Sequence, residues 1–185
     1  LVGVYLTKPR PTEGALTTIN RGFYISAAIG AIASAVAAFV YLPTDWVELG
    51  TGVDAEVNPA VFAALAVIIG VVLAAAIIGI TGYFTGTEFR PVRDIAKSTV
   101  TGPATVVLSG LSVGFESAVF TTFLIGGAVF IAALIGGAGS IAALFAVALA
   151  GCGLLTTIGA VVAMDTFGPV ADNAQGIAEM SGDIS

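Results

Sequence analysis

Four long apolar segments constrain this sequence more than any other feature. They span approximately residues 23–42, 60–84, 104–135 and 141–164. A helix that crosses a bilayer needs about 20 mostly apolar residues, and each segment reaches that length. Charged residues make up only 10% of the chain, whereas a soluble domain carries about 25%. The sequence therefore predicts an all-α fold, a polytopic bundle of transmembrane helices.

The charges in the polar connections predict how this bundle is oriented. The connection over 43–59 contains four acidic residues and no basic one. Basic residues fall only in two other stretches, as Lys8, Arg10, Arg21, Arg90, Arg93 and Lys97. The positive-inside rule places both basic stretches in the cytoplasm. We therefore expect the four helices to alternate in direction and residues 165–185 to form an acidic helical extension on the cytoplasmic side.

Composition also excludes several kinds of site. The chain has no histidine and a single cysteine, Cys152, so it can build neither a histidine metal site nor an intrachain disulfide. It has no basic patch with interleaved aromatic residues, so we expect no nucleic-acid partner. The chain starts at Leu1 without a methionine, inside an apolar stretch, and we expect both ends to be cuts in a longer protein.

Small residues recur within the apolar segments at a spacing of four. Gly110 and Gly114 form one such pair, and Gly70 is followed at the same spacing by Ala74. This spacing lets two helices approach closely in lipid. It indicates tight packing in a multi-helix bundle, although small residues are also common in membrane helices in general.

The fourth apolar segment continues into a polar stretch with three regularly spaced acids. Asp165, Asp172 and Glu179 are seven residues apart. Seven residues make about two helical turns, so the three carboxylates share one helix face at intervals of about 10 Å. Pro169 has no N–H to bond the carbonyl of Asp165, so we expect a kink or a free carbonyl there. Such a break is tolerated at membrane depth only inside protein or beside a wet cavity.

Acids in this arrangement can bind a polyanion only through divalent cations. Mg²⁺ is typically held by one or two carboxylates together with phosphates and waters. The residues thus permit a Mg²⁺–phosphate site at Asp165 and Asp172. The alternative is that both aspartates are solvated as the helix leaves the membrane.

The polar stretch also carries a family resemblance. The run MDTFGPVADNAQGIAEM at 164–180 closely resembles the pattern D-x-[YF]-G-P-[IV]-x-D-N-A-x-G-I-x-E-M of membrane-bound pyrophosphatases. The segments TGYFT at 81–85, RPV at 90–92 and TGPAT at 101–105 resemble a loop and helix start of the same family. By this resemblance the chain is an internal part of a subunit with about sixteen membrane helices, each of about 20 residues.

The resemblance implies a function as well as a fold. Members hydrolyse pyrophosphate with Mg²⁺ at a cytoplasmic site, export H⁺ or Na⁺, and work as homodimers. We therefore expect a multi-pass protein of the plasma membrane, surrounded by lipid, that pumps protons outward, with Na⁺ as the other candidate ion. Gly82, where many members have glutamate, favours the K⁺-independent proton pumps.

Individual roles follow from the matching positions. Asp172 matches an aspartate that helps to hold Mg²⁺ and, through it, pyrophosphate, and Asn173 is an amide that supports this site. Asp165 matches a deeper aspartate near the region of ion coupling and is a second metal or ion-transport candidate. Glu116 lies well inside the third apolar segment, and an intramembrane glutamate is a candidate for ion transport. A structural ion pair or a protonated carboxyl is the alternative for Glu116.

Two other functions remain open from the residues alone. A passive cation transporter or channel subunit could use the same acids without hydrolysis, and a purely structural bundle would use none of them. None of these residues is expected to be a catalytic nucleophile. We also expect the 185-residue chain alone not to hydrolyse pyrophosphate, because most of the family's site would come from other helices.

Overall fold

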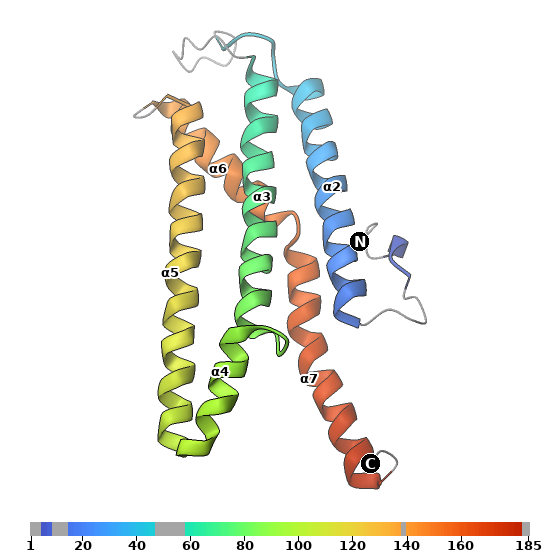
Figure 1. The fold of residues 1–185 in the computed structure, drawn as a ribbon. Coiled ribbons are helices and arrows are strands. Elements are labelled where there is room, and N and C mark those ends of the chain that lie inside the picture. The colour runs from blue at the N-terminus through green and yellow to red at the C-terminus, as the bar shows by residue number, and fades with distance from the viewer. Residues whose placement is uncertain (1–4, 9–14, 47–57, 138–139, 183–185) are drawn as a thin grey trace.

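The computed structural model is built from long helices that run up and down side by side (Figure 1). It describes residues 5–8, 15–46, 58–137 and 140–182. The helices are α2 (Ala15–Tyr41), α3 (Pro59–Thr85), α4 (Arg90–Ser98), α5 (Pro103–Ile135), α6 (Ile141–Leu155) and α7 (Ile158–Ser181), with a short 3₁₀ turn over Thr99–Thr101. Four helical stretches are long and apolar enough to cross a membrane. The all-helical membrane fold predicted from the sequence is confirmed.

Local sequence signals explain where several helices begin. Asn58 accepts a hydrogen bond from the backbone N–H of Ala60 at 2.8 Å, and Pro59 occupies the first turn of α3. Proline is favoured there because its missing N–H would have no partner inside the helix. Pro103 begins α5 in the same way, after Gly102 with φ of 113°. α2 starts before the apolar segment that was placed at 23–42, because the polar residues ahead of that segment are also helical.

Helix α3 is the centre of the fold and packs against α2, α5 and α6. Its contact with α6 is made by glycines on both helices. A Cβ added to Gly70 would overlap the carbonyl oxygen of Ala150, and one added to Gly153 would overlap that of Val67. Of the spaced small residues, Gly70 therefore lies at a tight helix crossing. A Cβ added to Gly110 or Gly114 of α5 would meet no atom within 4 Å in the described part of the chain.

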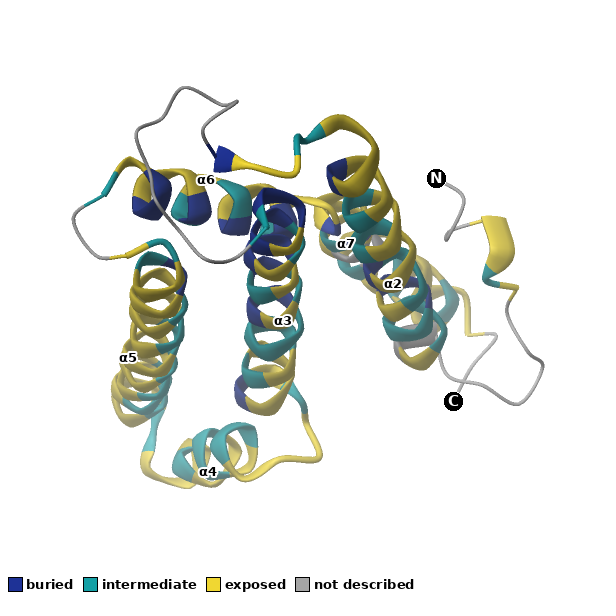
Figure 2. Ribbon diagram, turned by 90° about the horizontal axis from the view of Figure 1, so that it is seen from above, coloured by how far each residue is buried: buried dark blue, intermediate teal, exposed yellow. Residues whose placement is uncertain are grey.

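Helix α5 has a different environment from α3. Only Ala132 of its residues is buried, and most of its surface is exposed (Figure 2).

At the start of α3, Trp46 packs edge-on against Phe62 with the ring centroids 5.0 Å apart. Trp46 is 6% exposed, so its ring fills space between the packed helices.

The fourth apolar segment is divided, although the sequence predicts one helix over 141–164. α6 ends at Leu155 and α7 begins at Ile158 in a different direction (Figure 1). Thr156 Oγ1 donates to the carbonyl of Gly153 at 2.7 Å, and Thr157 Oγ1 donates to that of Leu154 at 3.3 Å. Threonine hydroxyls compete with the helical ladder in this way. α7 then continues without interruption through Pro169, so the change of direction lies well before the position where a kink was expected.

The described charged residues of the connections are divided between the two ends of the bundle. The start of α2, the end of α3, all of α4 and the acidic part of α7 lie at one end of the bundle (Figure 1). Arg21, Arg90, Arg93 and Lys97 therefore lie at the same end. Asp45 lies at the opposite end, and the other acids of the connection over 43–59 fall outside the described residues.

Candidate functional site

The candidate site is the acidic face of α7. Asp165, Asp172 and Glu179 all lie in this one helix and all are exposed. Their spacing of seven places them on one face, with about 10 Å between successive residues along the helix axis. The face begins where the segment is still apolar and ends at the C-terminal turn, where Gly182 with φ of 78° caps the helix. The three carboxylates therefore form one row along the exposed part of α7.

Helix α7 is positioned from its first turn. Ala160 packs in a cluster with Phe23 of α2, which is 0% exposed, and Ala74 of α3. Beside this cluster, the Cβ of Thr156 lies 3.2 Å from the position of a Cβ added to Gly30 of α2. The beginning of α7 is therefore held by two neighbouring helices, while the acidic part extends away from them (Figure 1).

The aspartates have no partner within the described residues. Asp165 and Asp172 make no ion pair or side-chain hydrogen bond there. Asn173, next to Asp172, is also exposed. Glu179 differs because its carboxylate accepts a hydrogen bond from Gln175 Nε2 at 2.7 Å. The two aspartates thus have all their acceptor positions available, whereas one oxygen of Glu179 already accepts a hydrogen bond within its own helix.

The chemistry of these groups fits part of a Mg²⁺ site. Mg²⁺ prefers oxygen ligands and is usually held by one or two carboxylates plus phosphates and waters. Asp172 alone can supply the protein's share of such a coordination. The described residues contain no group of three or more acidic or cysteine side chains that could hold a metal ion. Asp165 and Asp172 are two turns apart and would therefore contribute to separate positions.

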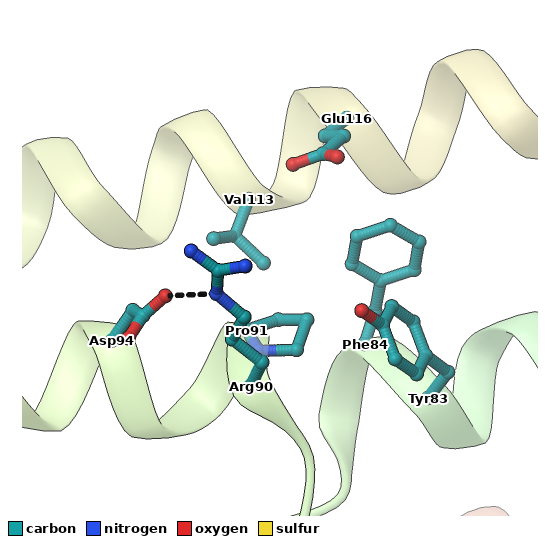
Figure 3. A pocket seen from close by; sticks show the side chains of 7 residues that line it. All are labelled: Tyr83, Phe84, Arg90, Pro91, Asp94, Val113 and Glu116. Carbon is teal, nitrogen blue, oxygen red and sulfur yellow. Dashed lines mark hydrogen bonds and ion pairs between the residues drawn. The ribbon is translucent and has the colours of Figure 1, made fainter.

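A second group of charged residues lines a cavity of about 290 Å³ between three helices. Tyr83 and Phe84 come from the end of α3, and Glu116 comes from α5 (Figure 3). Arg90 and Asp94 come from α4 and form an ion pair at 3.2 Å. The sequence predicts that Glu116 lies well inside the membrane-spanning part of its helix. In the structure it lies beside the end of α3 and the start of the charged helix α4 (Figure 3).

Asp94 is the centre of the charge network on α4. It accepts hydrogen bonds from Lys97 Nζ at 3.0 Å and from Arg90 Nε at 3.2 Å. The hydrogen bond from Lys97 is the largest cause that holds the pKa of Asp94 below its ordinary value, and Arg90 acts in the same direction. The spacing of Arg90, Asp94 and Lys97 predicts these contacts within a helix. Only the folded chain brings Glu116 and the end of α3 beside them, so sequence reasoning did not find this cavity.

Comparison with protein-family models matches residues 1–184 to the family described as inorganic H⁺ pyrophosphatase. A Streptomyces coelicolor protein named K⁺-insensitive pyrophosphate-energized proton pump is 56% identical over all of this chain. A Chloroflexus aurantiacus protein of the same name is 40% identical over 97% of the chain. The chain spans only 24% and 23% of the lengths of these two relatives.

A shorter relative is matched over most of its own length. The Mycoplana dimorpha protein named pyrophosphate-energized proton pump 2 is 34% identical over 98% of this chain, and the match covers 83% of that relative. The family match over residues 1–184 includes every residue that the structure describes, and therefore all of α7.

Proposed function

The chain belongs to the inorganic H⁺ pyrophosphatase family, and on this premise we propose that it forms part of a membrane pump that couples pyrophosphate hydrolysis to outward proton transport. The acidic face of α7 is the single observation that carries this proposal. It combines a family-matching sequence with two exposed aspartates that have no partner in the described part of the chain. The names of the relatives favour a pump over a passive cation channel.

In the proposed site Asp172 is a ligand to Mg²⁺ and reaches pyrophosphate through it. When bound, Mg²⁺ would neutralise the phosphate charge and orient the reacting groups. Asn173, adjacent and exposed, offers an amide that can donate a hydrogen bond to a phosphate oxygen or a water. A carboxylate without a counter-ion would repel the substrate, so the role of Asp172 depends on a cation.

Asp165 is proposed to handle the transported ion. It lies on the same face as Asp172 but about 10 Å closer to the membrane-spanning part of α7. A carboxylate at that depth can take up and release a proton, or bind Na⁺, between the hydrolytic site and the bilayer. The names of the relatives support H⁺. The proposal also includes assembly as a homodimer in the plasma membrane, with α4 and the acidic face of α7 in the cytoplasm as the basic residues indicate.

The test uses the intact pump in sealed vesicles. Phosphate release and internal acidification should both require Mg²⁺ and pyrophosphate. Asp172→Asn should lower hydrolysis by at least about 100-fold, because even residues that only support metal ligands change activity by about 10–100-fold. Glu179→Gln is the matched control: it removes a carboxylate from the same face, but one that is already bonded to Gln175.

Two results would contradict the proposal. Full hydrolysis by a correctly folded Asp172→Asn pump would remove this residue from the site. Ion movement through the unmodified protein without pyrophosphate would favour the passive transporter. An Asp165→Asn pump that still hydrolyses pyrophosphate but no longer acidifies vesicles would support the separate role of Asp165, whereas unchanged acidification would exclude that role.

A further inference from the structure

The cavity beside Glu116 lies where the charged end of the bundle meets its uncharged part. Glu116 is the single charged residue of α5, and the residues that follow it, 117–135, contain none. At about 1.5 Å per residue that stretch is about 28 Å long, close to the hydrocarbon thickness of about 30 Å. On the other side of the cavity, α4 carries Arg90, Arg93 and Lys97. A membrane span formed by residues 117–135 would place the cavity at the depth of the lipid headgroups.

Two groups of opposite charge in the cavity still have free bonding capacity. Arg90 uses Nε for Asp94 and turns its two Nη atoms toward α5 (Figure 3). Glu116 makes no hydrogen bond or ion pair with any described residue. A guanidinium fork binds phosphate well, and the exposed carboxylate of Glu116 can accept hydrogen bonds from a positively charged donor. The cavity thus has one position for an anion and one for a cation.

The cavity is half open, and its lining combines polar groups with a smaller apolar surface. Tyr83, Phe84 and Val113 provide apolar surface beside the charged groups. Phe84 also contacts Phe120 of α5 with ring centroids 5.9 Å apart, so the apolar wall continues into the uncharged stretch. Phe120 is 48% exposed. A volume of about 290 Å³ is near the lower end of the range of about 300–1,000 Å³ for ligand sites, which suits a headgroup whose tails leave along an apolar surface.

We propose that this cavity binds the headgroup of a zwitterionic aminophospholipid, with its phosphate on Arg90 and its primary ammonium on Glu116. An anionic lipid without an ammonium would leave Glu116 unpaired and would meet the negative charges of Glu116 and Asp94. A choline headgroup has the positive charge but no N–H to donate to the carboxylate. The proposal is independent of pyrophosphate hydrolysis, because it concerns α3, α4 and α5 only.

The test measures lipid binding to the intact protein in detergent by native mass spectrometry. The probes are phosphatidylethanolamine, phosphatidylcholine and phosphatidylglycerol with identical acyl chains. We expect phosphatidylethanolamine to bind most tightly. Glu116→Gln should weaken it by about tenfold, as expected for a hydrogen bond between charged groups, and should weaken phosphatidylcholine less. Glu88→Gln and Arg93→Gln are matched controls, because both residues are exposed and lie outside the lining of the cavity.

Arg90→Gln provides an independent reading if Glu116→Gln does not fold. It should weaken phosphatidylethanolamine and phosphatidylcholine alike, because both carry the phosphate. Equal binding of these two lipids by the unmodified protein would overturn the proposal. An unchanged preference for phosphatidylethanolamine in Glu116→Gln, or unchanged binding of both lipids in Arg90→Gln, would also overturn it.

Discussion

Helices α6 and α7 come from one continuous stretch of sequence, yet they contribute differently to the molecule. α6 buries a row of small residues, including Ala146 at 0% exposure, against α3. α7 is held only near its start, and its acidic face is exposed. The closely packed half fixes the position of the segment, while the half with few contacts leaves its carboxylates exposed.

The largest effect of a substitution is expected at the glycine contact between α6 and α3. Gly153→Ala would place a methyl group against the backbone of Val67, and overpacking of this kind costs about 1–3 kcal/mol of stability. Gly151→Ala, on the same helix, meets nothing within 4 Å and should gain up to about 1 kcal/mol through helix propensity. Thermal unfolding of the intact protein in detergent measures both. If Gly153→Ala and Gly151→Ala changed the stability by the same amount, the crossing would not be tightly packed in the intact protein.

A smaller effect should appear at the junction between the two helices. Thr157 is 2% exposed and its hydroxyl bonds the carbonyl of Leu154. Thr157→Val keeps the shape but removes this bond, which should cost about 1 kcal/mol. Thr166→Val removes the same kind of bond, to Val162 and Ala163, on the exposed part of α7. Its cost should be near zero, and a cost as large as that of Thr157→Val would remove the contrast between the helices.

The smallest effect on stability is expected for exposed ion pairs, such as those that Asp94 makes on α4. The pKa of Asp94 is lowered in the folded chain by Lys97 and then Arg90. The stabilisation is therefore present above the ordinary aspartate pKa of about 3.9 and is lost as the pH falls through the lower, folded value. The melting temperatures of the unmodified protein and Asp94→Asn should differ slightly at neutral pH and converge in acid. A difference that grows in acid would reverse the assigned direction.

Sequence pattern was sufficient for most of the helices but not for the break between α6 and α7. Long uncharged segments have few alternatives in a membrane, and Asn58 with Pro59 marks the start of α3 locally. Thr156 and Thr157 interrupt a segment whose hydropathy stays high on both sides. Their hydroxyl groups form hydrogen bonds to backbone carbonyls at the end of α6. A hydropathy profile of the sequence does not detect such bonds.

The two groups of charged residues differ in the same respect. The acidic face of α7 follows from spacing alone, because all its members lie on one helix. The cavity around Glu116 needs three helices to meet, so no local spacing predicts it. The position of Glu116 beside α4 likewise depends on how far α5 extends past the end of α3, which only the packing of the chain determines.

The hydrogen bonds at the α6–α7 junction have one more consequence. Both threonine hydroxyls bond carbonyls three residues earlier in their own chain, so these bonds remain intact whatever the angle between the two helices. That angle is fixed elsewhere, by Phe23 of α2 and Ala74 of α3 against Ala160 of α7. The direction of α7 and of its three carboxylates is thus set at the start of the helix by α2 and α3 together, at a place separate from the glycine crossing between α3 and α6.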